Sequence, residues 1–337
     1  MGDHLKNPSS RSHETGAEAQ PALSSVTAVV LTHRRPRLAT AVVRSLIERE
    51  GLPPDRVVVV INEPGGLEDA ALESSVRLVR LPRNVGPAGG FGAGMEVAFA
   101  DPSVRWAYLC EDDIGLFSLP SPRLADVIRR AEDRGQLPGR SVGAVVAYGR
   151  NFVGRGAHTV NLAPPMGSPD DLVPVDVASW GATLLARSVF DAGIVPDPEW
   201  FFGLEDVDFF CRVRQGGFDV LLDAVSARAV ADQQTSTGRA GALGRYRPTD
   251  DRETWRSYYH ARNSILLARR HGKPSWHVWH MAYSVRHLQK ATGRVERKAI
   301  LHGLWDGIRG RVGENPDYGR TMGEHVGADE DAGSPHG

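Results

Sequence analysis

The chain has 337 residues, of which 41% are apolar and 24% charged; this composition supports a large core and excludes a chain that is disordered throughout. Two cysteines, Cys110 and Cys211, are too few for a disulfide scaffold, and no Cys/His spacing typical of a structural zinc site occurs. The sequence lacks both an apolar stretch of the roughly 18 residues that a spanning helix needs and the apolar centre of a secretory signal. We therefore expect a cytoplasmic protein.

The net charge of −1 hides an uneven distribution. Residues 255–320 carry 13 Lys/Arg and 4 Asp/Glu, a net of +9, so the rest of the chain carries −10. Basic outer faces of amphipathic helices explain this most simply. The sharper alternative is peripheral contact with an anionic membrane, helped by Trp276 and Trp279. No recognised nucleic-acid motif accompanies the charge, so we expect no nucleic-acid partner.

In chain order, short β-branched runs alternate with helical patterns. Strands are expected within 26–32, 55–66, 75–82, 105–114, 141–150 and 218–230, helices within 35–50, 86–100 and 205–217, and a strand followed by a helix within 177–193. This alternation is typical of a doubly wound, mostly parallel sheet. From about Asp251 the pattern becomes helical. We therefore expect a disordered tail over 1–24, an α/β domain over 25–235, a helical region over 236–320 and a second disordered tail over 321–337.

Polar residues follow several of these strands. Thr32, Asn62 and Asn84 stand at or just after strand ends, as do the three acids at 111–113. In open α/β sheets, ligands bind at the carboxyl ends of the strands. We therefore expect these side chains to gather at one edge of the sheet.

The three acids are Glu111, Asp112 and Asp113. Adjacent carboxylates repel one another, so burying them together is costly without a cation. Mg²⁺ or Mn²⁺ bound through one or two carboxylates and a substrate phosphate fits this pattern. On an extended segment, Glu111 and Asp113 share a face. The simpler alternative is a solvated turn with a helix cap.

A second acidic cluster, Glu205, Asp206 and Asp208, follows an aromatic run at 200–202. A carboxylate beside an aromatic wall can serve as a general base, because partial desolvation raises its pKa. The alternative is that these acids only stabilise the N-terminus of the following helix.

The glycine-rich segment RNVGPAGGFGAG leads into a helix. It fails the dinucleotide fingerprint, because Met95 stands at the third glycine position, and it lacks the Gly-Lys-Ser/Thr end of a P-loop. Glycines such as Gly86 and Gly89 still suit close approach to a nucleotide or diphosphate. A tight turn that lets the helix pack is the alternative.

The order of these motifs resembles the family 2 glycosyltransferases of the GT-A (nucleotide-diphosphosugar transferase) fold. The resemblance rests on VVLTHRRP, PRNVGPAGGFGAG, YLCEDDI and, most specifically, WFFGLEDVDFFCRVRQGGF, and it covers roughly 26–217. The last block is closest to bacterial enzymes that transfer rhamnose or galactofuranose. The resemblance implies a GT-A mixed sheet followed by a helical region.

It also implies an inverting transfer of a sugar from a nucleotide diphosphate to a hydroxyl. Asp206 would be the general base, with Glu205 beside it. The remaining assignments are nucleotide-sugar binding by Thr32, Arg35, Asn62, Asn84, Gly86, Gly89 and Asp112, Mg²⁺ or Mn²⁺ binding by Glu111, Asp113 and Asp232, and acceptor binding by Trp180, Trp200 and Phe201.

The sequence departs from the family pattern at three places. Ile61 stands where an Asp commonly precedes the strand-end Asn, and Glu111 takes the leading position of the DxD metal motif. A late metal-binding His is missing; Asp232 could replace it as an oxygen ligand. These departures leave two points open: how the base of the nucleotide is recognised, and whether a metal ion is strictly required.

UDP is the first expectation for the nucleotide and dTDP the second. The acceptor could be a glycan, a lipid-linked sugar or a small metabolite, and a homo-oligomer is left open. Two rivals remain. One is a nucleotide-sugar-binding protein without catalysis. The other is a nucleotidyltransferase on a related fold, although the glycines it needs beside the first strand are absent.

Overall fold

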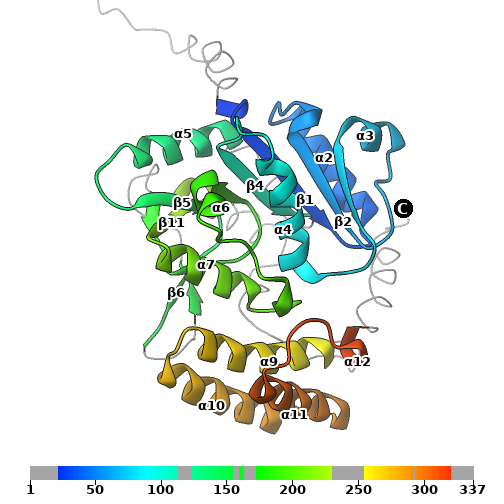
Figure 1. The fold of residues 1–337 in the computed structure, drawn as a ribbon, viewed down its shortest axis with the longest axis vertical. Helices are drawn as coiled ribbons and strands as arrows, with labels where there is room; N and C mark the ends of the chain where they lie inside the picture. The colour runs from blue at the N-terminus through cyan, green and yellow to red at the C-terminus, as the bar shows by residue number, and fades with distance from the viewer. Residues whose placement is uncertain are drawn as a thin grey trace, which may run out of the picture.

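The apolar runs of the sequence become the inner strands of one eight-stranded sheet (Figure 1). The computed structural model describes residues 22–112, 123–154, 159–162, 172–229, 254–291 and 293–319. The strand order is β3-β2-β1-β4-β10-β5-β11-β8. The strands in chain order are β1 (Val26–Thr32), β2 (Val57–Asn62), β3 (Arg77–Leu81), β4 (Trp106–Glu111), β5 (Ser141–Val146), β8 (Leu172–Pro174), β10 (Thr183–Ala186) and β11 (Phe218–Asp223).

The sheet is mixed in direction. Strands β1 to β4 run parallel, and so do β5 and β11, whereas β10 is antiparallel to both of its neighbours and β8 to β11. Both β1 and β2 are buried along their whole length, which explains their unbroken runs of apolar residues. The expected doubly wound α/β sheet is confirmed. A smaller sheet, β7-β6-β9, is built from β6 (Gly149–Phe152), β7 (Thr159–Asn161) and β9 (Val177–Ala178).

Helices cover both faces of the large sheet. On one face α4 (Gly86–Phe99) lies so close that a methyl group on Gly94 would overlap Val29 and Val60. On the other face the backbone N–H of Leu124, at the start of α5, donates to Glu50, just after α2, at 2.7 Å. The elements around the sheet are α2 (Pro36–Glu48), α3 (Ala70–Ser75), α5 (Leu124–Gly135), α6 (Arg187–Asp191), α7 (Glu205–Gln215) and the 3₁₀ turns η1 (Pro54–Arg56) and η3 (Pro198–Trp200).

The C-terminal part is helical, as expected, and forms the lower end of the molecule in Figure 1. It consists of α9 (Thr254–Arg270), α10 (Pro274–Lys290), α11 (Arg294–Arg309) and the short α12 (Pro316–Gly319). The expected domain boundary at 235/236 lies outside the described residues. None of the helices that the structure describes is long and apolar enough to cross a membrane.

The N-terminal expectation needs one correction. A tail was expected over 1–24, but residues 22–24 are described and begin with a helical turn. Leu23 is buried in the main core and the hydroxyl of Ser25 donates to the Ala22 carbonyl at 3.0 Å. Residues 22–25 therefore pack as part of the sheet domain ahead of β1. Residues 1–21 and 320–337, which hold the rest of the two expected tails, lie outside the described residues.

Two buried side chains of α9 join the helical part to the sheet domain. The Arg262 guanidinium donates to the carbonyls of Trp200 at 2.8 Å and Gly313 at 2.5 Å. The Asn263 amide donates to the carbonyls of Phe202 and Gly203, each at 2.7 Å. Three of the four acceptor carbonyls lie between the end of η3 and the start of α7. The turn over 200–204 is therefore fixed from α9.

We predict that Asn263→Ala lowers the free energy of unfolding by about 2 kcal/mol. The substitution leaves buried carbonyls of the turn without a donor, which costs roughly 1–3 kcal/mol in a folded core. The matched control is Asn161→Ala, at an exposed position of β7, where the change should stay within about 0.5 kcal/mol. Chemical denaturation measures both. Equal effects at the two sites would show that α9 does not hold the turn.

Candidate functional site

The ends of β1 and β4 meet in a buried polar cluster. The Thr32 hydroxyl donates to Oδ2 of Asp112 at 2.6 Å, and the guanidinium of Arg35 forms an ion pair with Oδ1 of the same carboxylate. Asp112 is almost fully buried, whereas Arg35 is partly exposed. Asp112 therefore holds the positively charged side chain of Arg35 in place at the carboxyl ends of the strands.

A second cluster forms where β2 ends. The Asn62 amide donates to Oδ1 of Asn84 at 3.0 Å and to the Gly86 carbonyl at 3.2 Å. The side-chain oxygen of Asn62 accepts from the Val85 N–H at 2.9 Å. The two amides thus hold the entry to α4. Thr32, Asn62, Asn84, Glu111 and Asp112 therefore lie at one edge, as expected, while Asp113 lies outside the described residues.

Three residues of this edge were not singled out from the sequence. His33, Arg34 and Glu63 directly follow β1 and β2, and Glu63 accepts from His33 at 2.7 Å and pairs with Arg34. Arg34 and Glu63 both have positive φ, at 56° and 129°, a strained state that clusters at functional sites. Burial lowers the pKa of His33 despite the hydrogen bond to Glu63, so the ring is neutral at pH 7. Their place after strand ends was the available signal.

The glycine loop touches the aromatic turn that leads into α7. A methyl group on Gly86, whose φ is 75°, would stand 1.7 Å from the Phe201 carbonyl oxygen. Gly89 lies against Val85 and, in η3, Pro198. Gly89 therefore lets the loop close on its own Val85, whereas Gly86 is needed for packing between the loop and the turn. This contact joins the strand-end clusters to the second acidic cluster.

Glu205 and Asp206 open α7, in different surroundings. Burial raises the pKa of Glu205 to about 8, and the charges of Asp206 and Glu111 act in the same direction. Its Oε2 has no hydrogen-bond partner among the described residues. Asp206 accepts from Arg150 at 2.6 Å and from the Val207 N–H at 2.7 Å. A carboxyl group with a raised pKa thus stands beside an ion-paired carboxylate at the start of α7.

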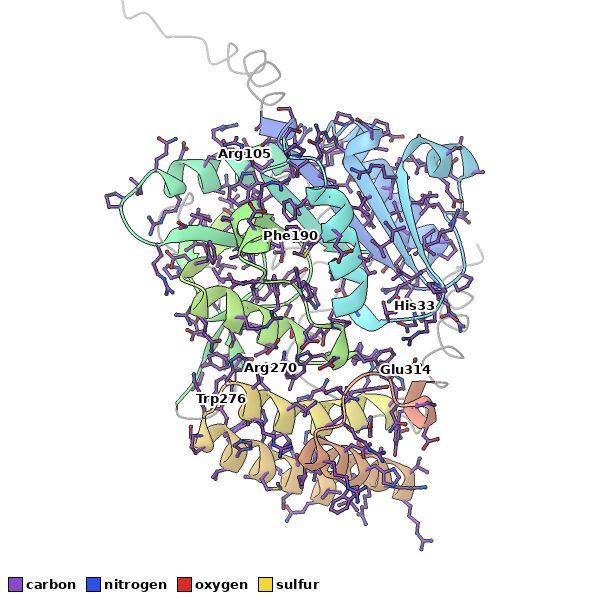
Figure 2. The ribbon with its side chains drawn as sticks, viewed as in Figure 1. His33, Arg105, Phe190, Arg270, Trp276 and Glu314 are labelled. Carbon is purple, nitrogen blue, oxygen red and sulfur yellow. The ribbon has the colours of Figure 1, made fainter. Side chains whose placement is uncertain are left out.

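Asp208, the third acid of this cluster, has a different role. Its buried carboxylate contacts Arg212 at 2.9 Å, Arg270 at 3.1 Å and His271 at 3.1 Å. Burial alone would raise the pKa of Asp208, but the His271 hydrogen bond and the two arginines outweigh it and lower the pKa. Asp208 therefore ties α7 to the end of α9. Figure 2 shows Arg270 at this boundary and His33 across it from Glu314.

The three aromatic residues expected to bind the acceptor are buried in this structure. Trp180, Trp200 and Phe201 are only 5%, 2% and 2% exposed, so none offers a ring face to an acceptor in this arrangement. Trp180 packs 4.9 Å from Phe91, and Phe201 5.1 Å from Tyr259 of α9, between ring centroids. These rings are buried because they pack the sheet against α4 and α9. Acceptor contact by them would require movement.

Only part of the expected metal site is described. Glu111 ends β4 beside the acidic start of α7, and its carboxylate oxygens suit Mg²⁺ or Mn²⁺. Asp112 is already engaged by Thr32 and Arg35, while Asp113 and Asp232 lie outside the described residues. Within the described ranges, no group of three His, Cys, Asp or Glu side chains is close enough to hold a metal. Glu111 therefore fits one ligand position, and the others stay predictions.

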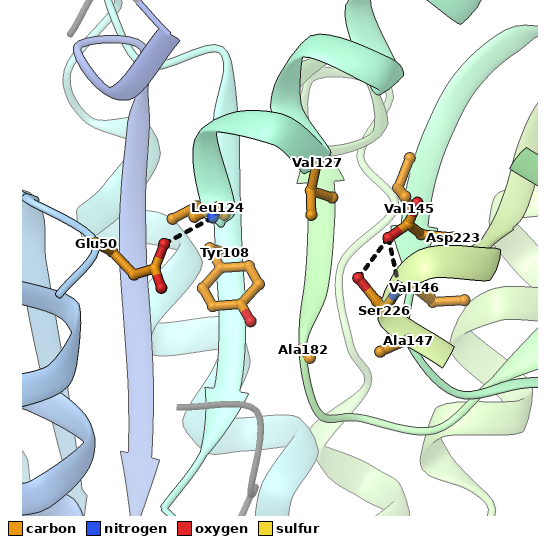
Figure 3. Close-up of a pocket in the computed structure, with 10 residues that line it drawn as sticks. All are labelled: Glu50, Tyr108, Leu124, Val127, Val145, Val146, Ala147, Ala182, Asp223 and Ser226. Atoms are coloured by element: carbon orange, nitrogen blue, oxygen red, sulfur yellow. Dashed lines mark hydrogen bonds between the residues drawn. The ribbon is translucent and has the colours of Figure 1, made fainter. Parts of the chain in front are cut away.

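A separate cavity lies under α5 on the other face of the sheet (Figure 3). Its two acids already have partners: Glu50 accepts from Leu124, and Asp223 accepts from Arg130 at 2.8 Å and from the Ser226 N–H at 2.9 Å. Apolar side chains make up most of the remaining lining. This cavity belongs to the packing of α5, and the chemistry-bearing residues lie at the strand edge.

Comparison with known proteins adds little beyond this geometry. No family model and no curated protein matches the chain. Among solved structures, S. aureus TarS 1–349 matches with a TM-score of 0.40 and 11% identity over 85% of this chain and 92% of that one. The same protein in complex with UDP matches with a TM-score of 0.40, 10% identity and the same coverage. A likeness this loose carries no residue role, ligand or activity to the present chain.

We predict that Gly86→Ala disrupts the strand edge far more than its backbone strain alone explains. Gly193→Ala is the matched control, because its φ of 74° is nearly the same but no atom lies within 4 Å of the added methyl group. The control should cost about 1–2 kcal/mol for the left-handed conformation. Gly86→Ala should cost clearly more, because the Phe201 carbonyl has to move. Thermal unfolding of the two variants compares them, and equal losses would contradict the close contact.

We predict that Glu205 makes stability fall as pH rises from about 5 to 8. In this range the folded chain keeps a proton that an ordinary glutamate, with a pKa of 4.5, has lost in the unfolded chain. The unfolding free energy should therefore drop by roughly 1 kcal/mol per pH unit from this group.

Glu205→Gln cannot ionise, so this variant should lose that slope in denaturant titrations with EDTA present. Glu48→Gln, at an exposed position of α2, should keep the wild-type slope. Parallel pH profiles for wild type and Glu205→Gln would show that Glu205 is not held protonated.

Proposed function

We propose that the protein is a glycosyltransferase that moves a sugar from a nucleotide diphosphate to a hydroxyl acceptor, with inversion. The observation that carries the proposal is the meeting of three groups at one sheet edge. These are the oriented Arg35, the Asn62–Asn84 pair that holds the glycine loop, and the carboxyl groups that open α7. The sequence resemblance to family 2 glycosyltransferases supports the same function.

Binding of the donor follows from the charges and amides of the edge. Arg35 is partly exposed and anchored by Asp112, so it can pair with a diphosphate without losing its position. The hydroxyl of Thr32 and the amides of Asn62 and Asn84 supply nearby polar groups for the nucleotide. UDP is the first candidate and dTDP the second. A cation held by Glu111, with Asp113 and Asp232, would neutralise charge on the leaving diphosphate.

The transfer itself needs one base and one displacement. In the proposed reaction Asp206 accepts the proton of the acceptor hydroxyl while that oxygen bonds to the anomeric carbon of the sugar. The bond from that carbon to the diphosphate oxygen breaks, and the nucleoside diphosphate leaves with the electron pair. Attack from the opposite face inverts the configuration, so no protein nucleophile is required.

Arg150 affects the proposed role of Asp206 as the base, because the two side chains form an ion pair in the present structure. The pair fixes the direction of the carboxylate, and the acceptor hydroxyl has to approach the oxygen that binds the Val207 N–H or replace Arg150. The same ion pair favours the second candidate, a nucleotide-sugar-binding protein without catalysis. Turnover distinguishes the two.

We predict that Asp206→Asn lowers kcat for sugar transfer by about 10²–10⁴-fold, the usual contribution of a general base. Binding of the nucleotide should remain, because Asp206 lies outside the Arg35 and Asn84 clusters. The matched control is Asp219→Asn on β11, which should keep the wild-type kcat.

Thermal unfolding with UDP, dTDP, GDP and CMP, each with Mn²⁺ or EDTA, first identifies the donor class. Ligand at about 100 times its Kd should add roughly 2.7 kcal/mol. If a nucleotide still raises the unfolding midpoint in the presence of EDTA, the metal is removed from the proposal but the transferase function is kept. Nucleotide binding without turnover of any matching nucleotide-sugar would favour the binding protein. Wild-type kcat in Asp206→Asn would exclude Asp206 as the base.

A further inference from the structure

The outer side of α11 carries an apolar stripe on a basic surface. Leu301, Trp305 and Ile308 follow one another at helical spacing and are all exposed, Trp305 by 53%. Val312 continues the exposed apolar residues just beyond the helix. A contiguous exposed apolar patch on a protein surface marks an interaction site.

The two helices beside this stripe expose only basic charges, whereas Glu314 and Asp317 of the segment after α11 line one pocket together with Trp305 and Arg309. Within their helical spans, α10 carries two Lys/Arg and α11 carries four. The two acids of α11, Glu296 and Asp306, are buried, and α10 has no Asp or Glu. Arg294, Lys298 and Arg309 are exposed on α11. The exposed charge of the two helices is therefore entirely basic.

The tryptophan that is exposed in the structure differs from the two that the sequence suggested. The sequence pointed to Trp276 and Trp279, but Trp276 is 3% exposed and packs against Phe152, with 4.9 Å between ring centroids. Trp279 stacks on Tyr283 of its own helix. Trp305 instead lies on the surface, with the guanidinium of Arg309 4.3 Å from its ring centroid. The aromatic and basic groups thus occur together on α11.

We propose that this face of α11, formed by Leu301, Trp305 and Ile308 with Arg294, Lys298 and Arg309, docks on an anionic lipid bilayer. An amphipathic helix with Leu and Trp on one face and Lys/Arg beside them lies in the interface of an anionic membrane. A second copy of the same face would bring like charges together. A nucleic acid offers phosphates but no apolar layer for the stripe. The inference does not depend on the proposed transfer reaction.

Co-sedimentation of the full chain with vesicles tests the proposal. The protein should bind vesicles of phosphatidylcholine with phosphatidylglycerol, should bind much less to phosphatidylcholine alone, and should be released by salt. Arg294→Gln with Lys298→Gln should weaken binding about 30-fold, because each basic residue near the surface contributes about a factor of five. Leu301→Gln with Ile308→Gln should weaken it by about tenfold or more.

The matched control, Arg129→Gln with Leu137→Gln, changes an exposed arginine and an exposed leucine at α5 and should bind as wild type does. Brominated lipid should quench tryptophan fluorescence in the wild type and much less in Trp305→Phe, which keeps an apolar ring. Circular dichroism confirms that each variant is folded.

Four results would overturn the proposal. They are no binding to anionic vesicles, equal binding to neutral ones, unchanged binding of both α11 double variants, and quenching that persists in Trp305→Phe. Self-association that the α11 variants abolish would assign the face to a second copy instead. Binding of a duplex oligonucleotide in place of vesicles, through the same residues, would assign it to nucleic acid.

Discussion

The structure depends on the turn over 200–204, which is strained and is held from both sides. Phe201, Gly203 and Leu204 all have positive φ, at 58°, 79° and 66°, and two of these are not glycine. Such a conformation persists only when its surroundings enforce it. Here Arg262 and Asn263 bind the carbonyls of the turn from α9, while Gly86 packs against it from the sheet domain. The end of this turn sets where α7 begins.

The helical region consequently contributes to the candidate functional site by holding its residues in place. Its inner helix, α9, fixes the turn through Arg262 and Asn263 and contacts Asp208 through Arg270, so it positions the acids of α7 at two points. The outer helix α11 faces solvent with basic and apolar side chains. In the proposed function, α9 thus positions the acids of α7, and α11 presents the proposed docking face.

Electrostatics at the strand edge follow from which carboxyl groups have a cationic partner. Asp112 and Asp206 are paired with Arg35 and Arg150, so burial does not leave their charge uncompensated. Glu205 has no such partner in the described structure, and burial therefore raises its pKa. The neighbouring acids Glu205 and Asp206 thus have different surroundings because the partner of Asp206 comes from a distant element.

The sequence by itself determined the mostly parallel α/β sheet, the helical C-terminal part and the gathering of Thr32, Asn62 and Asn84 at one edge. These follow from local periodicity and from the rule that parallel strands end together, neither of which needs distant contacts. Only the tertiary structure decided that Trp180, Trp200 and Phe201 are buried, that Arg150 pairs with Asp206, and that Trp305 rather than Trp276 is exposed. Burial and ion pairing depend on which segments meet in space, and residues far apart in the chain carry no local signal of that meeting.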